Sequence, residues 1–350
     1  MVKRVAFAVP GDLSLPTGGY AYDRRMIAEL QKLGWQVDIV QLGEGFPRPD
    51  PGIKAAAQEK LAAVGKGCPI IVDGLAFGVM PEAASALRDS NPVVALVHHP
   101  LALESGISDA DAERFRDSER EALAAARGVV ATSPSTATIL NEEYDVPPEL
   151  ITVAFPGTDP GEMSKGSADG IVRMLAVGSV VPRKGYDTLI AALAPLVDMP
   201  WRLAIVGDRS RDEAAAAKLD TAILEHRVAA KVDMLGTLPA ERLAALYAES
   251  DLFVLPSLFE GYGMAFAEAL AHGLPVVGTT AGAIPDTVPP NAGVLIEPND
   301  VKALTRTLRM LIGNPKERAW FAQGAREAGA ALPRWDEQAK LLAAAIEAAT

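Results

Sequence analysis

Two carboxylates flank a pair of glycines in the second half of the chain. Glu260, Gly261 and Gly263 follow the apolar run 252–255, which predicts a buried parallel strand, and Glu268 lies in the helical run that comes next. Glycines let the backbone approach a ligand closely, and the first amides of a helix favour an anion. A carboxylate beside an anion is costly unless it has another task, such as binding sugar hydroxyls. The alternative is that Glu260 supports the loop and Glu268 faces solvent.

A basic loop, 178–185, joins a predicted strand at 172–177 to a predicted helix. It contains Arg183 and Lys184 with glycines on either side. Arginine offers a planar fork and lysine a compact charge, so the pair can neutralise a diphosphate. The carboxyl ends of parallel strands meet at one edge of a sheet, and we therefore expect this loop to lie beside Glu260. A loop that only improves solubility is the alternative.

The first half contains a histidine and a glycine turn at positions where ligands bind. His98 directly follows the apolar run 93–97, and open α/β sheets bind ligands at the carboxyl ends of strands. The turn Thr17-Gly18-Gly19 joins a predicted strand at 5–9 to a predicted helix at 21–33, as in phosphate-binding β-α-β units. It is not G-x-G-x-x-G, and no acidic residue closes the next strand, so an NAD site has little support. A local cap and a plain connection are the alternatives.

Composition excludes several classes of protein. The chain has 350 residues, of which 49% are hydrophobic, and a net charge of −12. This charge argues against nucleic acid or an anionic membrane as the main partner. Cys68 is the single cysteine, which excludes an intrachain disulfide and favours a reducing, cytoplasmic location. The apolar run near the amino terminus is too short for a signal peptide or a spanning helix.

Strands and helices alternate through both halves, which predicts an α/β fold of two doubly wound domains. The sequence turns polar and rich in proline and glycine at 155–170 and then resumes the alternation. We place domains at 1–160 and 161–333, with a last helix at 334–350. In the second half the predicted elements are strands at 172–177, 202–206, 232–235, 252–255, 275–278 and 293–296, and helices at 186–196, 212–226, 239–248, 264–271, 301–311 and from 316.

Taken together, these residues resemble the retaining GT-B glycosyltransferases of glycosyltransferase family 4. The most specific part of the resemblance is Glu260-x7-Glu268, followed by Ala-Leu-Ala-His-Gly-Leu-Pro-Val-Val at 269–277. In that family the first glutamate contacts the transferred sugar and the second binds the nucleotide ribose. The resemblance covers nearly the whole chain. It implies two Rossmann-like domains facing each other across a cleft, with the carboxyl-terminal helix crossing back to the first domain.

Other segments match the family residue by residue. Gly19 corresponds to the glycine whose amide approaches the donor phosphate, and His98 to the strand-end histidine near the sugar. The segment 282–286 resembles Gly-x-x-Pro-Glu/Asp, and 235–238 the stretch whose backbone meets the nucleobase. The resemblance thus implies catalytic roles for Glu260 and His98, diphosphate binding by Gly19 and Lys184, ribose binding by Glu268 and base binding by Leu238. From the residues themselves we expect Arg183, Gly261 and Gly263 to take part in diphosphate binding as well.

The chain departs from the family at three positions. Ser179 stands where Gly-Arg-x-x-x-x-Lys-Gly has its arginine, and we expect Arg183 to supply that charge beside Lys184. His99 replaces a common aspartate, and Arg209 follows Asp208 where glycine is usual. These two changes are candidates for altering the choice of donor or acceptor.

The resemblance implies transfer of a hexose from a UDP- or GDP-linked donor to an acceptor, with retention and without a metal or other cofactor. The Asp109-Ala-Asp111 segment is similar to a metal-binding D-x-D motif, but it opens a helix, where acids are favoured electrostatically. We expect a soluble acceptor, because the first half has no basic amphipathic helix.

Four alternatives stay open. They are a catalytically silent nucleotide-sugar binding protein, a sugar-nucleotide epimerase, the same transfer to a membrane lipid, and a glycosidase. On one helix, the separation of Glu260 and Glu268 would be about 12 Å, more than the spacing of about 5 to 9.5 Å between glycosidase carboxyl groups. Glu260 is expected in a loop, so this weakens the glycosidase alternative without excluding it.

Overall fold

The computed structural model describes residues 3–15, 17–104 and 106–350. The chain folds into two compact units: Met1–Gly157 with Pro333–Thr350, and Thr158–Leu332. The domain limits predicted from the sequence, at 160 and 333, stay predictions.

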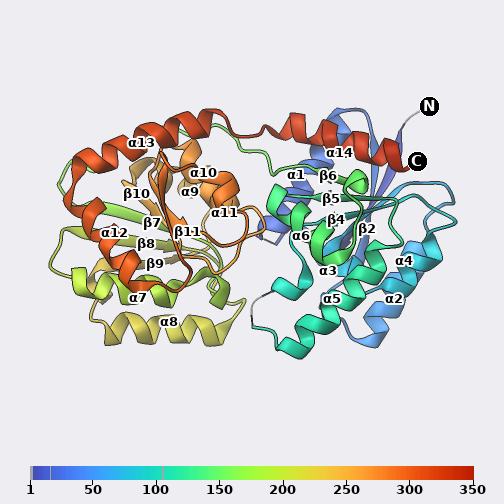
Figure 1. Ribbon diagram of the computed structural model, residues 1–350, viewed down its shortest axis with the longest axis horizontal. Helices are drawn as coiled ribbons and strands as arrows, with labels where there is room; N and C mark the ends of the chain where they lie inside the picture. Colours follow the sequence, from blue (N-terminus) through green and yellow to red (C-terminus); the bar gives the residue numbers. More distant parts are fainter. Residues whose placement is uncertain (1–2, 16, 105) are drawn as a thin grey trace. The chain divides into compact units, whose positions relative to one another are not determined.

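The first unit is built on a six-stranded parallel sheet in the order β2-β1-β3-β4-β5-β6 (Figure 1). Its first strand lies between the second and the third, so the chain winds outward in both directions from β1. The predicted apolar runs form strands here because both faces of a parallel sheet are buried. The strands are β1 (Arg4–Pro10), β2 (Gln36–Gly43), β3 (Ile70–Asp73), β4 (Val93–Val97), β5 (Gly128–Ala131) and β6 (Ile151–Val153).

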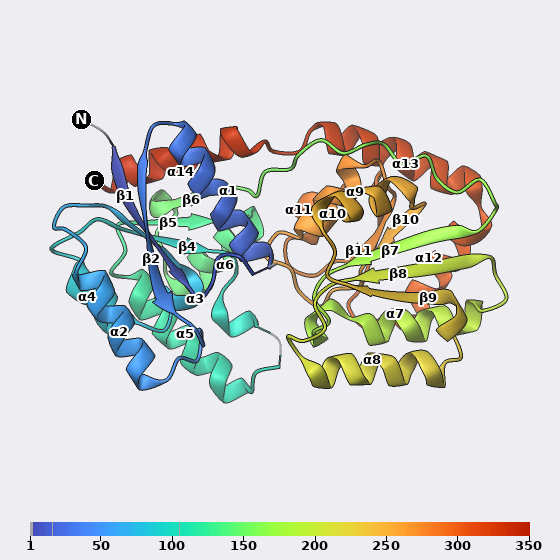
Figure 2. The same cartoon turned by 180° about the vertical axis from the view of Figure 1, so that it is seen from behind.

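Helices cover both faces of this sheet. Figures 1 and 2 show α1 and α14 on one face and α2, α4 and α5 on the other. The α-helices of this unit are α1 (Gly18–Lys32), α2 (Pro51–Ala62), α3 (Gly74–Phe77), α4 (Pro81–Leu87), α5 (Asp109–Leu123), α6 (Pro134–Tyr144) and α14 (Trp335–Ala349). The carboxyl-terminal helix α14 packs against α1 and against β4, β5 and β6. The sequence did not predict α3 and α4, which are too short for a clear helical period.

The second unit has a six-stranded parallel sheet in the order β12-β11-β10-β7-β8-β9. Counted from its own first strand, this is the doubly wound order 3-2-1-4-5-6, and its switch point lies between β7 and β10. The strands are β7 (Val172–Val177), β8 (Trp201–Val206), β9 (Val232–Gly236), β10 (Leu252–Val254), β11 (Val276–Thr279) and β12 (Gly293–Ile296). The predicted class, α/β with two Rossmann-like doubly wound domains, is confirmed.

In this unit α7, α8 and α12 lie on one face of the sheet and α9, α10 and α13 on the other (Figures 1 and 2). The α-helices are α7 (Tyr186–Leu193), α8 (Glu213–Glu225), α9 (Ala240–Glu249), α10 (Met264–Ala271), α11 (Ile284–Thr287), α12 (Val301–Gly313) and α13 (Pro315–Ala330). The helix predicted at 186–196 ends at Leu193, because Pro195 cannot donate a helical hydrogen bond and the next turn is a 3-10 turn. None of the helices in the described part of the chain has the length and apolar content that crossing a membrane requires.

Candidate active site

The basic loop (178–185) and the loop that carries Glu260 (255–263, the carboxylate loop) meet in the second unit. The strands that precede them, β7 and β10, are direct neighbours in the sheet. Glu260 accepts hydrogen bonds from both cations: Arg183 Nη1 lies 3.0 Å from Oε2, and Lys184 Nζ lies 2.6 Å from Oε1. Ser257 Oγ also donates to Glu260 Oε1, over 2.6 Å. Glu260 therefore supports the loop, which was the alternative to a role in sugar binding, and it does so through the residues predicted to bind a diphosphate.

Backbone contacts fix the two loops against each other. Leu258 N donates to Arg183 O over 2.7 Å, and Arg183 Nη1 donates to Phe259 O over 2.7 Å. Gly185 has a φ of +65°, and a Cβ atom there would lie 2.2 Å from Pro256 O. Only glycine combines this backbone conformation with such a close approach. The basic loop is thus held in place by contacts that a side chain at position 185 would break.

The cluster carries an excess of positive charge. Burial alone raises the pKa of Glu260, but the charges of Lys184 and Arg183 outweigh burial and lower it to about 2. Burial lowers the pKa of Lys184, and the nearby charges of Arg183 and Arg211 also act to lower it. With Glu260 ionised, two cations and one carboxylate leave one net positive charge. Such a site suits an anion that brings more than one negative oxygen.

The segment after β11 supports the carboxylate loop from the other side. Ala283 N donates to Glu260 O over 2.9 Å, and Thr287 Oγ1 donates to Tyr262 O over 3.0 Å. Gly282 has a φ of +56°, and a Cβ atom there would lie 2.3 Å from Glu260 O. The Gly-x-x-Pro-Asp segment therefore positions Glu260 through its backbone.

Glu268 lies on α10, which begins directly after the carboxylate loop. Its side chain accepts a hydrogen bond from Tyr247 OH at Oε2, over 2.9 Å, and burial raises its pKa. Tyr247 stacks on His272 with ring centroids 5.0 Å apart. The alternative of a solvent-facing Glu268 is wrong, because the residue is half-buried and hydrogen-bonded. Gly263 caps the helix with a φ of +88° and offers no side chain to its first amides.

Leu238, the predicted base-binding residue, lies apart from this cluster. It is half-buried in the loop between β9 and α9, and β9 is an edge strand separated from β7 by β8. The structure places it at the same, carboxyl-terminal edge of the sheet. It takes no part in the hydrogen bonds that join Arg183 and Lys184 to Glu260.

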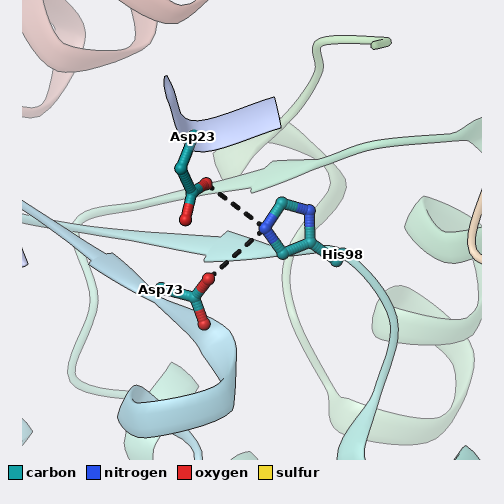
Figure 3. A group of neighbouring side chains, drawn as sticks. All are labelled: Asp23, Asp73 and His98. Atoms are coloured by element: carbon teal, nitrogen blue, oxygen red, sulfur yellow. Dashed lines mark ion pairs between the residues drawn. The ribbon is translucent and has the colours of Figure 1, made fainter. Parts of the chain in front are cut away.

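In the first unit His98 meets two aspartates (Figure 3). Its Nε2 lies 3.3 Å from Asp23 Oδ1 and 3.4 Å from Asp73 Oδ2. Asp23 comes from the middle of α1, and Asp73 is the last residue of β3, the strand beside β4. Both aspartate side chains are buried, whereas that of His98 is 19% exposed. Burial lowers the pKa of His98, but the interactions with Asp23 and Asp73 outweigh burial and raise it to about 10.

Gly19 and Tyr22 bring α1 close to the His98 ring. A Cβ atom at Gly19 would lie 3.3 Å from His98 Cδ2, so glycine allows the first turn of α1 to rest against the imidazole. Tyr22 meets the same ring edge-on, with centroids 5.2 Å apart. His99 has a different partner, since its Nε2 lies 3.2 Å from Glu104 Oε2. Two of the predicted residues, His98 and Gly19, thus lie close together.

Sequence reasoning missed Asp23 and Asp73. Asp23 shares a helix face with Ile27 and Leu30, which are buried, so an acidic residue on an apolar stripe was the available signal. Asp73 ends a strand whose other residues are all apolar, at the edge of the sheet where His98 also lies. Which strands are neighbours, however, follows only from the sheet order.

The donor atoms of Asp23, Asp73 and His98 all lie within 4.8 Å of one another, which is close enough to hold a metal ion. Two carboxylates and an imidazole form a chemically suitable donor set for a divalent transition metal. The D-x-D segment has other contacts, because Asp111 binds Ser108 and forms ion pairs with Arg48 and Arg114.

Comparisons with known proteins agree with this architecture. The family model of "Glycosyltransferase Family 4" matches residues 18–162, and that of "Glycosyl transferases group 1" matches residues 164–328. An MMP alpha-(1->4)-mannosyltransferase of Mycolicibacterium hassiacum is 28% identical over 74% of this chain and 66% of its own length. A GDP-mannose-dependent monoacylated alpha-(1-6)-phosphatidylinositol monomannoside mannosyltransferase of Corynebacterium glutamicum is 33% identical over 42% of this chain and 39% of its own length. The chain therefore spans less than two thirds of these relatives.

The fold also has solved counterparts. The structure of a sucrose-phosphate synthase from Thermosynechococcus elongatus superimposes with a TM-score of 0.82 at 21% identity, covering 97% of this chain and 98% of that one. At this identity the likeness concerns the fold.

Proposed function

Since the chain belongs to the GT-B glycosyltransferases of family 4, we propose that it transfers a hexose from a nucleoside diphosphate sugar to an acceptor hydroxyl, with retention at the anomeric carbon. The observation that carries this proposal is the cluster of Arg183, Lys184 and Glu260 at the switch point between β7 and β10. A departing diphosphate needs positive charge that is fixed in advance, and the cluster has one net positive charge in a largely buried setting.

In the proposed reaction the bond between the anomeric carbon and the phosphate oxygen breaks, and its electron pair stays on the diphosphate. Arg183 and Lys184 stabilise that charge, together with the backbone at Gly261 and Gly263 and the amide of Gly19. The acceptor oxygen bonds to the same face of the anomeric carbon, and its proton passes to the departing phosphate. Glu260 contacts the sugar while it holds the two cations, and His98 lies near the sugar.

The rest of the donor binds to neighbouring residues of the second unit. We propose that Glu268 accepts hydrogen bonds from the ribose hydroxyls, with Tyr247 fixing the carboxylate at 2.9 Å. The backbone around Leu238 meets the base. In the family an arginine stands at the position that Ser179 occupies here. Arg183 supplies that charge instead, because it already lies in the cluster.

UDP and GDP donors are both compatible with these contacts, and a GDP-mannose-dependent relative favours testing GDP first. We propose a small hydroxylated acceptor and a reaction without a metal. The name of that relative also keeps a lipid acceptor as a second candidate. Sedimentation with phosphatidylinositol vesicles distinguishes the two, since only a lipid-directed enzyme should pellet with them. A cytoplasmic location stays a prediction.

Calorimetry with UDP and GDP tests the donor site. We expect Lys184→Ala and Glu268→Ala to weaken nucleotide binding by about tenfold or more, because each removes a charge-assisted contact. Lys218→Ala is the matched control, because Lys218 pairs with Asp187 on the surface of the same unit. If both site variants bind the nucleotide as tightly as the wild type, the assignment is wrong.

Two other functions predict different reactions from the same site. A catalytically silent binding protein would bind the donor but would not hydrolyse it, even slowly. An epimerase would act without an acceptor, whereas the proposed transferase should release nucleoside diphosphate much faster once its acceptor is present.

A further inference from the structure

His98 is held by carboxylates from two different elements. Asp23 approaches from α1 and Asp73 from the end of β3, and Figure 3 shows both directed at the same ring nitrogen. The separations of 3.3 and 3.4 Å are nearly equal. Nε2 makes no linear hydrogen bond to either oxygen. This is the arrangement expected when one N–H is shared by two carboxylates.

Burial makes this contact important for all three residues. The Asp23 side chain has no exposed surface, and its two oxygens accept no hydrogen bond from the described residues. Leu75 N donates to Asp73 Oδ1 over 2.7 Å, so Oδ2 is the oxygen that Asp73 gives to the histidine. A buried carboxylate is costly unless a cation compensates it. Among the described residues, the cation within ion-pair distance of each aspartate is His98.

The contact also fixes the direction of the ring. With Nε2 turned toward the aspartates, Nδ1 lies on the side of the ring that faces away from them (Figure 3). Thr132 Oγ1 donates to His98 O over 3.0 Å, and Tyr22 and Gly19 pack on the ring. The backbone and ring plane of His98 are therefore fixed before any substrate binds.

We propose that Asp23 and Asp73 are positioning residues for His98: they share its Nε2 proton, fix the ring, and leave Nδ1–H as a charged donor for a substrate oxygen. This inference rests on the proposed function only for the identity of that oxygen. A permanently charged donor would stabilise an oxygen that gains negative charge in the transition state more than it stabilises the ground state. The groups that face the ring are Asp23 and Asp73, with Tyr22 as an uncharged neighbour at neutral pH.

Proton NMR of the histidine ring tests the contact without any substrate. The chain has four histidines, and a His98→Gln spectrum identifies the signal of His98. We expect this signal to stay in its protonated position up to about pH 9 in the wild type, since the aspartates raise the pKa of His98 to about 10. In Asp23→Asn and Asp73→Asn the midpoint should fall by about one pH unit or more. Asp38→Asn, a half-buried site on β2 whose partner is Arg4, is the control and should leave it unchanged.

Steady-state kinetics tests the functional part. We expect each asparagine variant to lower kcat by about tenfold or more, because His98 loses part of the charge and orientation that it supplies to the transition state. The KM for the donor should change by less than about threefold, because the contact acts in the transition state. The variants should also lose activity on the alkaline side at a lower pH than the wild type, because their His98 gives up its proton earlier. A residue that only supports the fold would not shift that profile.

Several results would overturn the proposal. One is a His98 titration that is the same in the wild type and both variants. Another is a stoichiometric divalent metal in the purified wild type that Asp23→Asn loses, since the three residues would then be metal ligands. If one variant fails to fold, the other variant and the wild-type titration still decide. If the titration shifts as expected but the wild type turns over no nucleotide sugar, the proposed function fails while the contact itself stands.

Discussion

A single buried carboxylate, Glu260, joins the two loops of the donor site. Its side chain is 7% exposed and binds Lys184, Arg183 and Ser257. The sequence suggested separate tasks, with Glu260 for the sugar and the cations for the diphosphate. The contacts make these tasks interdependent, because the carboxylate that is proposed to meet the sugar also holds the cations.

Replacing Glu260 by glutamine should destabilise the protein in a pH-dependent way. At pH 7 we expect a loss of about 3 kcal/mol, because two buried cations lose their partner. The folded-state pKa of Glu260 is lowered to about 2 from an ordinary value of 4.5, so its stabilising contribution is present above pH 4.5. The contribution should be lost as the pH falls from 4.5 toward 2, because Glu260 takes up a proton at a higher pH in the unfolded state than in the folded state. Urea unfolding of both proteins across this range measures the difference.

Glu82→Gln provides the comparison for Glu260. Glu82 also pairs with a lysine, Lys54, but its side chain is 67% exposed. Its replacement should change the free energy of unfolding by less than about 0.5 kcal/mol at any pH. Equal losses for the two variants would contradict the view that the Glu260 cluster is a buried, interdependent unit.

At the level of elements, the carboxylate loop depends on the segment that joins β11 to α11. Gly282 lets this segment touch the Glu260 backbone, where a Cβ atom would lie 2.3 Å from Glu260 O. Gly282→Ala should therefore displace Glu260 and weaken nucleoside diphosphate binding by about tenfold or more, the size of one lost charge-assisted contact. Calorimetry with the nucleotide measures this.

Gly170→Ala separates this effect from backbone strain. Gly170 has a φ of +77°, but no atom of the described residues lies within 4 Å of the position that a Cβ atom would take there. The alanine should cost about 1 kcal/mol of stability, the penalty of the left-handed conformation, and leave nucleotide binding unchanged. Should Gly282→Ala behave in the same way, the segment would have no part in placing Glu260.

The elements themselves were largely predictable from local patterns. The continuous apolar run 93–97 coincides with β4, because a strand buried on both faces needs no polar residues. The strand predicted at 172–177 coincides with β7. The boundaries shift where a local rule competes, as at Pro195, which ends α7 early. The short helices α3, α4 and α11 lack a full apolar period and cannot be recognised in this way.

At the scale of the whole molecule, the candidate site was predictable where its residues follow the carboxyl ends of neighbouring parallel strands. Lys184 and Glu260 meet because β7 and β10 are neighbours, which the expectation of a doubly wound sheet anticipates. Asp23 and Asp73 were not predictable as partners of His98. Their encounter depends on the packing of α1 on the sheet and on the order β1-β3-β4, neither of which a single sequence encodes locally.

We propose that this chain transfers a hexose from a nucleotide sugar with retention and without a metal. The most direct measurement is NMR of the wild-type protein with a panel of UDP- and GDP-hexoses in the presence of EDTA. We predict release of one nucleoside diphosphate, a sugar product that first appears in the anomeric configuration of the donor, and loss of this turnover in Lys184→Ala. A product of inverted configuration, turnover abolished by EDTA, or no turnover of any donor would contradict the claim.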